Sequence, residues 1–107
     1  MFARTVECQA KRGQSEEMNT RVNNDVVPTL QKQPGFVEFL ALSDKSDPER
    51  VLCISLWNTR EDADKHQREH YDVITSLLTP FLESSPTLGT FTVNASTAHR
   101  IAVSRAA

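Results

Sequence analysis

Four short alternating segments and two longer periodic segments divide this 107-residue chain. Alternating apolar and polar positions are typical of strands, whereas an apolar residue at every third or fourth position is typical of a helix. The pattern predicts strands at residues 2–8, 36–43, 51–57 and 88–94. It also predicts two helices, one beginning near residue 15 and the other near residue 60.

The first predicted helix has an apolar stripe and a weak point near its end. Its apolar side chains recur at every fourth position, at Met18, Val22, Val26 and Leu30. Pro28 has no backbone N–H to donate, so we expect it to kink or loosen the last turns. The pair Pro34-Gly35 then ends the helix.

The second predicted helix begins after Thr59, which forms a capping-box pattern with Asp62. Its first half is mostly polar and includes His66 and His70. Pro80 and Pro86 close it. We expect the helix face that packs on the sheet to carry a residue at every third or fourth position: Ala63, Gln67, His70, Ile74, Leu77 and Phe81.

The order of the elements predicts an α+β fold. Strand, helix, strand, strand, helix, strand is the β-α-β-β-α-β arrangement of a ferredoxin-like domain with an antiparallel sheet. Right-handed crossovers place both helices on one face of that sheet. Residues 1–94 make up this single domain, and residues 95–107 are expected to form a mobile or partner-reaching tail.

The third predicted strand is apolar on both faces, and this indicates a partner. Side chains alternate across a strand, so Val51, Cys53, Ser55 and Trp57 share one face and Leu52, Ile54 and Leu56 share the other. Two helices cover only one side of a small sheet. We therefore expect a second copy of the sheet to cover the other side, in a homodimer.

Composition narrows the classes of partner. The formal net charge is −2, and Lys and Arg are scattered singly, so we expect no nucleic-acid partner. No apolar run reaches the ~20 residues that cross a bilayer, and the first residues lack the pattern of a signal peptide. We therefore expect a cytoplasmic protein without a membrane partner, in which Cys8 and Cys53 stay reduced.

Two junctions in the chain resemble those of the antibiotic biosynthesis monooxygenase-type domains. One is the end of the first helix, Val26-Val27-Pro28-Thr29-Leu30 with Gln33-Pro34-Gly35-Phe36, and the other is Ser55-Leu56-Trp57-Asn58-Thr59-Arg60-Glu61-Asp62-Ala63. The resemblance covers roughly residues 2–94. It implies a dimeric α+β barrel, in a superfamily that includes cofactor-independent monooxygenases acting on phenolic polyketides, haem-degrading enzymes and small proteins without an assigned activity.

The resemblance also bears on single positions. Haem-degrading members have an Asn in the first strand, where this chain has Thr5 and Glu7 on either side of Val6. We therefore expect no productive haem turnover and no cofactor. Quinone-forming members have, besides the Trp at the position of Trp57, an Asn before it and a Tyr and an Arg after it. Near those three positions this chain has Cys53, Ala63 and Leu77.

Three side chains are candidates for a site. Trp57 has two alternative roles. It either forms the wall of a ligand pocket, as a stacking surface and indole donor, or fills the core, as large aromatic residues usually do. His66 and His70 are candidate catalytic bases, because they lie four residues apart on one helix face and titrate near neutral pH. The alternative is that both are solvated. No metal site is expected, since neither a third ligand nor a Cys-x-x-Cys pair is evident.

Two functions follow from these residues. The first is a cofactor-independent monooxygenase acting on a small aromatic or quinol in a pocket between sheet and helices. The second is a dimer of the same fold that binds a small ligand or a partner without catalysis, since fold does not determine function.

Overall fold

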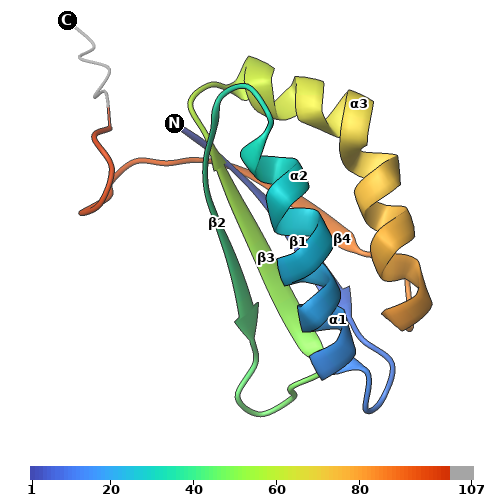
Figure 1. Cartoon of the computed structure of the whole chain (residues 1–107). Helices are drawn as coiled ribbons and strands as arrows, with labels where there is room; N and C mark the ends of the chain where they lie inside the picture. The colour runs from blue at the N-terminus through green and yellow to red at the C-terminus, as the bar shows by residue number, and fades with distance from the viewer. Residues whose placement is uncertain (102–107) are drawn as a thin grey trace, which may run out of the picture.

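Four strands form one antiparallel sheet in the order β2-β3-β1-β4 (Figure 1). The computed structural model describes residues 1–101. The strands are β1 (Phe2–Gln9), β2 (Phe36–Ser43), β3 (Arg50–Trp57) and β4 (Thr87–Thr92). Every neighbouring pair is antiparallel, which confirms the predicted ferredoxin-like sheet. The last strand begins one residue earlier and ends two residues earlier than predicted.

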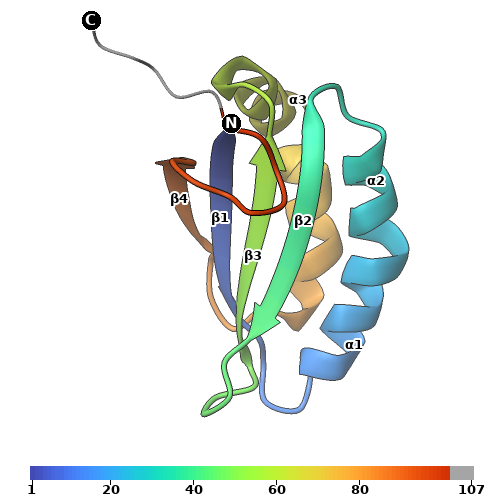
Figure 2. The same cartoon turned by 90° about the vertical axis from the view of Figure 1, so that its left-hand side faces the viewer.

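The helices lie on one face of the sheet, as predicted (Figures 1 and 2). The first helical segment consists of α1 (Ser15–Arg21), the π-helical turn η1 (Val22–Val26) and α2 (Val27–Gln31). The second consists of α3 (Arg60–Leu78) and the 3₁₀ turn η2 (Thr79–Phe81). Among the helices of residues 1–101, none has the length and apolar character that crossing a membrane requires.

The π-helical turn lies directly before Pro28. The backbone N–H of Val27 donates to the carbonyl of Val22, five residues earlier, instead of to the carbonyl four residues earlier. Pro28 has no N–H, and its ring would clash with the carbonyl of Asn24 in a regular helix. A wider turn relieves this conflict. The predicted loosening is thus present, on the N-terminal side of the proline.

Thr59 caps α3 as predicted, but Asp62 bonds back to the Thr59 hydroxyl instead of to the backbone N–H that a full capping box would use. The Thr59 hydroxyl accepts the backbone N–H of Asp62 at 3.1 Å, and it donates to the Asp62 carboxylate at 2.9 Å. Gly35 ends the loop before β2 with a φ of +76°, a backbone conformation that favours glycine. A Cβ at Gly35 would lie 2.1 Å from Asp62 Oδ2. The first helical segment therefore ends directly against the cap of α3.

The core lies between the sheet and the helices. Trp57, Met18, Val51 and Cys8 have the largest fully buried side chains. The apolar stripe of the first helical segment is buried as predicted, at Met18, Val22, Val26 and Leu30.

One detail of β2 differs from strict alternation. A bulge between Phe36 and Glu38 puts Phe36 opposite Trp57 and packs it against the core, instead of on the side of Leu40.

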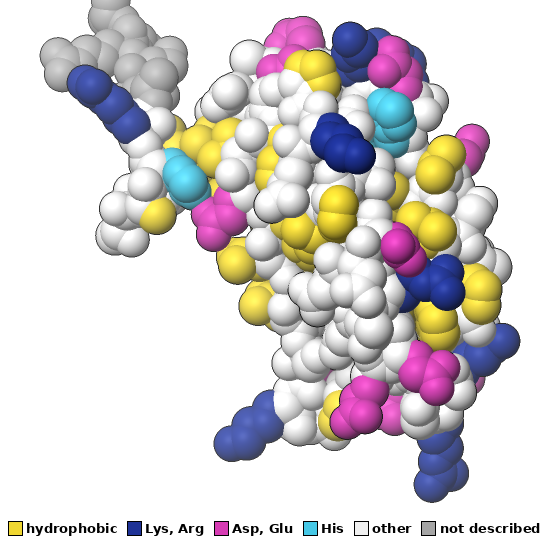
Figure 3. All heavy atoms as spheres, in the orientation of Figure 1, with side chains coloured by type: hydrophobic (Ala, Val, Ile, Leu, Met, Phe, Trp, Pro, Cys, Tyr) yellow, Lys and Arg dark blue, Asp and Glu magenta, His cyan; other side chains and the backbone are white. Residues whose placement is uncertain are grey.

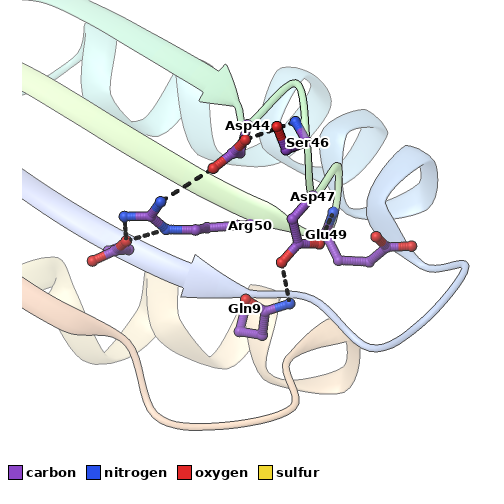
Figure 4. Close-up of polar contacts among 7 residues, drawn as sticks. Gln9, Asp44, Ser46, Asp47, Glu49 and Arg50 are labelled. Atoms are coloured by element: carbon purple, nitrogen blue, oxygen red, sulfur yellow. Dashed lines mark hydrogen bonds and ion pairs between the residues drawn. The ribbon is translucent and has the colours of Figure 1, made fainter.

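The turn between β2 and β3 is held by polar contacts (Figure 4). Arg50 donates to Glu7 at 2.6 Å and to Asp44 at 3.1 Å, so one guanidinium ties the ends of three strands together. The carboxylate of Asp44 also accepts the backbone N–H of Ser46. These contacts hold the pKa of Asp44 below its usual range, with the Ser46 N–H as the largest cause.

The opposite face of the sheet carries no helix. The strand register places these apolar side chains on it together: Leu40, Leu42, Leu52, Ile54, Leu56 and Phe91. Leu40, Leu42 and Phe91 are 44%, 46% and 57% exposed. On the side drawn in Figure 3, apolar side chains instead lie in separate groups among charged ones. No helix of residues 1–101 covers the apolar side chains of this open sheet face.

The segment after β4 returns across this open face (Figure 2). His99 is hydrogen-bonded to the carboxylate of Glu38 on β2. The Ser96 hydroxyl accepts the backbone N–H groups of Ala98 and His99, which shapes the turn. Of the expected tail, His99 thus contacts the chain's own sheet, and residues 102–107 lie outside the described residues.

We propose that a second copy of the chain covers the open face, as the two-faced third strand leads us to expect. The chain should then run as a dimer of roughly 24 kDa, twice its mass of 12.0 kDa. Ile54→Lys would place a charge in the middle of the interface, and we expect it to give a monomer or an insoluble protein. Light scattering at micromolar concentration measures the outcome.

Val73→Lys is the matched control for this prediction. Val73 is a 57% exposed aliphatic side chain on α3, away from the open face, so the same change there should leave the dimer intact. A wild-type chain that is monomeric, or an Ile54→Lys chain that remains a soluble dimer, would refute the proposed interface.

Candidate functional site

A small cavity lies between the sheet and the two helical segments. Its volume is about 60 Å³. Apolar side chains from η1, α2, β2 and α3 form most of its wall, including Val22, Val26, Leu30, Phe39 and Ile74. Polar side chains enter it from β1, β3 and α3: Arg4, Ser55, His66, Gln67, Tyr71 and Thr75. A mostly apolar hollow with a few polar groups is the usual form of a small-molecule site.

Arg4 is the charged group of this cavity. It lies on β1, on the face that the helices cover, and only 9% of its surface is exposed. Its guanidinium donates to Asp64 at 2.6 Å and to Gln67 at 3.0 Å, both on α3. Its third nitrogen, Nε, is buried and has no hydrogen-bond partner. A guanidinium nitrogen always carries a proton, so this is a buried donor without an acceptor.

His66 is the second polar group, and it is 8% exposed. Its ring stacks on the indole of Trp57, with the centroids 4.8 Å apart and the planes 30° apart. Burial lowers the pKa of His66 to about 4, and the neighbouring His70 and Arg4 act in the same direction. The imidazole is therefore neutral at neutral pH. Its Nδ1 is buried without a hydrogen-bond partner.

Trp57 lies behind the cavity wall and is fully buried. It is not among the residues that line the cavity. Its indole N–H donates to the Ser55 hydroxyl at 2.9 Å, and that hydroxyl donates to the backbone carbonyl of Arg4 at 3.4 Å. Phe36 meets the indole edge-on, with centroids 5.6 Å apart. The structure thus places Trp57 as a core support of Ser55 and His66, both of which do reach the cavity.

His70 sits one turn further along α3. Its ring is 5.8 Å from that of His66, centroid to centroid, and its side chain is 34% exposed. It does not line the cavity. Its Nε2 lies 3.8 Å from a carboxylate oxygen of Glu69, at the protein surface. Of the two candidate histidines, the geometry places only His66 at the cavity.

Sequence reasoning missed five polar groups of this site: Arg4, Ser55, Gln67, Tyr71 and Thr75. A signal for Arg4 was present, because Arg4 shares its strand face with Phe2, Val6 and Cys8, and a charge on an apolar face needs a partner. Gln67 was placed on the inward stripe of the helix but not assigned a role. Nothing in its local sequence indicates that it would bind an arginine from the first strand.

The cysteines have no reactive character. Burial raises the pKa of Cys8 to about 11 and that of Cys53 to about 12. Both thiols are free and remain protonated at neutral pH, where the thiol is a poor nucleophile. Within residues 1–101, no three side chains of His, Cys, Asp or Glu converge in a way that could hold a metal ion.

The sequence profile of the antibiotic biosynthesis monooxygenase family matches residues 1–71. The chain belongs to this family. Its fold and its strand-Trp-helix junction agree with the resemblance seen in the sequence. No curated protein matches the chain in sequence at a significant level.

Solved structures show the same fold at low sequence identity. SnoaB, a cofactor-independent oxygenase from Streptomyces nogalater, superposes with a TM-score of 0.73 at 15% identity, over 92% of this chain and 98% of its own. A protein of unknown function from Nitrosomonas europaea gives 0.76 at 15%, over 96% and 95%. A conserved protein from Methanosarcina mazei gives 0.71 at 19%, over 84% and 89%.

The buried neutral His66 should make folding stability depend on pH. The ordinary pKa of 6.5 applies in the unfolded chain and about 4 in the folded one, so the unfolded chain takes up the proton first as pH falls. This lowers stability between about pH 6.5 and 4. From pH 7 to pH 5, wild type should lose about 1–2 kcal/mol more free energy of unfolding than His66→Gln does.

Urea unfolding at the two pH values measures this difference. His70→Gln is the control and should keep nearly the pH dependence of wild type, because His70 is partly exposed. Equal pH dependence in wild type and His66→Gln would show that His66 is not held neutral in the fold.

Proposed function

We propose that the chain is a cofactor-independent monooxygenase for a small aromatic phenol or quinol, with His66 as the base. The observation that carries this proposal is the neutral, buried imidazole at an apolar cavity, whose Nδ1 has no hydrogen-bond partner in the protein. Family membership and the fold shared with the Streptomyces nogalater oxygenase support the general class.

The chemistry needs little more than a cavity and a base. Triplet oxygen reacts slowly with closed-shell molecules, so the substrate itself must supply electrons from an ionised, electron-rich state. Removing a proton produces that state, and His66 would accept the proton. For a CH₂ group flanked by aromatic rings, reaction with O₂ gives C=O and H₂O. One oxygen atom stays in the product, the other leaves as water, and the substrate supplies all the electrons.

The lowered pKa keeps His66 unprotonated, but it also makes the imidazole a weak base while the cavity is empty. The imidazole is unprotonated at neutral pH and is ready to accept a proton without first losing one. An anionic substrate beside the ring would favour the imidazolium, because opposite charges attract strongly where water is excluded. The base would therefore become stronger as the substrate ionises. Trp57 would act indirectly, by holding the His66 ring in place through the stack.

The size of the cavity sets a condition on this function. A volume of about 60 Å³ is less than half that of the ~150 Å³ apolar cavity known to bind benzene. An aromatic ring is larger, so the wall must open to admit one. Two residues of the wall, Val22 and Val26, belong to the π-helical turn, and such turns occur frequently at functional sites.

The small cavity also favours a second candidate function, a non-catalytic dimer that binds a small ligand. Trp57 is absent from the cavity lining, and neither cysteine offers a nucleophile. In this case the polar groups of the cavity would bind a ligand and orient it, without any proton transfer.

Oxygen uptake with a panel of dihydroxynaphthalenes and anthrones tests the catalytic proposal. We expect consumption of O₂ without added metal or flavin. His66→Gln should lower turnover by about 100-fold or more, because general-base catalysis contributes about 10²–10⁴. His70→Gln, at the neighbouring surface position, should stay close to wild type. Full activity in His66→Gln would remove His66 as the base.

Fluorescence separates the two candidate functions. Trp57 is the only tryptophan of the chain, and it contacts two groups that border the cavity, so its emission reports on this one place. A saturable change of emission together with O₂ uptake supports the enzyme. The same change without O₂ uptake supports the binding dimer, and emission unmoved by the whole panel contradicts both.

A further inference from the structure

The unpaired nitrogen of Arg4 gives the cavity a chemical preference. We propose that Arg4 makes this cavity a site for a small aromatic anion, a carboxylate or phenolate, whose charged oxygen accepts the Nε–H while its ring lies against the apolar wall. This names the ligand class of the site in the proposed function and rests on that function only for the reaction that follows.

The first step is the incomplete pairing of Arg4. Its two outer nitrogens are bound by Gln67 and Asp64 at the α3 side. The inner Nε is buried, donates to nothing and belongs to a side chain that borders the cavity, so a ligand would reach it once the wall opens to admit the ring. A buried N–H without an acceptor is costly in a folded protein, and such groups are rare. A ligand oxygen would supply the missing acceptor.

The second step is the balance of charge around Arg4. Asp64 is its one carboxylate contact, and that contact is shared, since the exposed Arg60 lies 3.6 Å from the other Asp64 oxygen. The Asp64 side chain is 41% exposed, whereas that of Arg4 is 10% exposed. The negative charge thus lies toward solvent and the positive charge toward the interior. His66 is neutral, so it adds no second positive charge beside Arg4.

The third step is the shape of the rest of the wall. Val22, Val26, Leu30 and Ile74 offer no hydrogen bonds and suit a hydrocarbon ring. His66 Nδ1, the other buried polar atom without a partner, could accept a proton from a hydroxyl on the same ligand. One fixed cation, one acceptor and an apolar wall together match a small aromatic acid or phenolate better than a neutral hydrocarbon.

A purely structural role for Arg4 makes a different prediction. In that role Arg4 ties β1 to α3 through Asp64 and Gln67, and its substitution would change stability without changing which ligands bind. A preference between two ligands of the same shape is therefore the measurement that separates the roles. Benzoate and benzamide form such a pair, since they differ mainly in charge.

Calorimetric titration of the full-length wild-type chain with benzoate and benzamide tests the proposal. We expect benzoate to bind about 10- to 100-fold more tightly, the range for a hydrogen bond to a charged group. Arg4→Gln should reduce this ratio to near one. Arg60→Gln is the matched control: it removes the exposed arginine that faces the same carboxylate, and it should keep the ratio of wild type.

Asp64→Asn guards against an Arg4→Gln chain that fails to fold. It removes the carboxylate that competes for Arg4 and leaves Arg4 in place, so benzoate should bind several-fold more tightly than to wild type, with benzamide unchanged. Equal binding of the two ligands to wild type, or a benzoate preference that survives Arg4→Gln, would overturn the proposal. So would weaker benzoate binding in Asp64→Asn.

These titrations need no turnover, so their result is independent of the oxygen-uptake assay. A benzoate preference that depends on Arg4, in a chain that consumes no O₂, would leave the anion site standing and remove the monooxygenase. Uptake of O₂ in a chain without a benzoate preference would remove the anion site alone.

Discussion

The stack of His66 on the buried indole of Trp57 fixes the position of α3 over the sheet. Trp57 is held at the end of β3 by its bond to Ser55 and by the edge of Phe36. Because His66 packs on its flat face, the neighbouring turn of α3 has one position along the sheet. That position brings Asp64 and Gln67 to the guanidinium of Arg4 on β1. This contact between aromatic rings, together with Ala63 and Leu78 of α3 in the same core, thus sets the polar side of the cavity.

The same arrangement explains why the cavity holds polar groups whose hydrogen bonds are incomplete. A core arranged for stability alone would pair every buried donor and acceptor or replace them by apolar side chains. Here a guanidinium N–H and an imidazole nitrogen remain unpaired at the border of one hollow. Their cost to folding is offset by the apolar core around Met18 and Val51 and by the ties at the ends of the strands.

The parts of the fold that depend on local pattern could be predicted from the sequence. Alternation located the strands and showed the two apolar faces of β3, and Thr59 with Asp62 marked the start of α3. The Val37 bulge could not be found in this way, because one extra residue in a strand leaves no mark in its composition. Strict alternation would put Phe36 on the same side of β2 as Leu40, whereas Phe36 packs against the core.

The site was predictable only in part, for a related reason. His66 was identified by its residue type, but its depth depends on the rotation of α3, which the stack on Trp57 sets. The sequence left Trp57 open between a pocket wall and a core residue, and tertiary packing puts it in the core behind the wall. Arg4 acquires its role from residues about sixty positions away, and no local pattern contains that information.

The ring of His66 offers the most direct measurement of the central claim, that a neutral, buried imidazole borders the ligand site. Nitrogen-15 NMR of the three histidine side chains at about pH 6, near the ordinary histidine pKa, reports the charge of each ring. We predict the neutral pattern for His66, and shifts of its nitrogens that saturate as benzoate is added, while His99 on the opposite face of the sheet stays unchanged. A charged His66 ring at this pH, or nitrogens that do not respond to benzoate, would contradict the account.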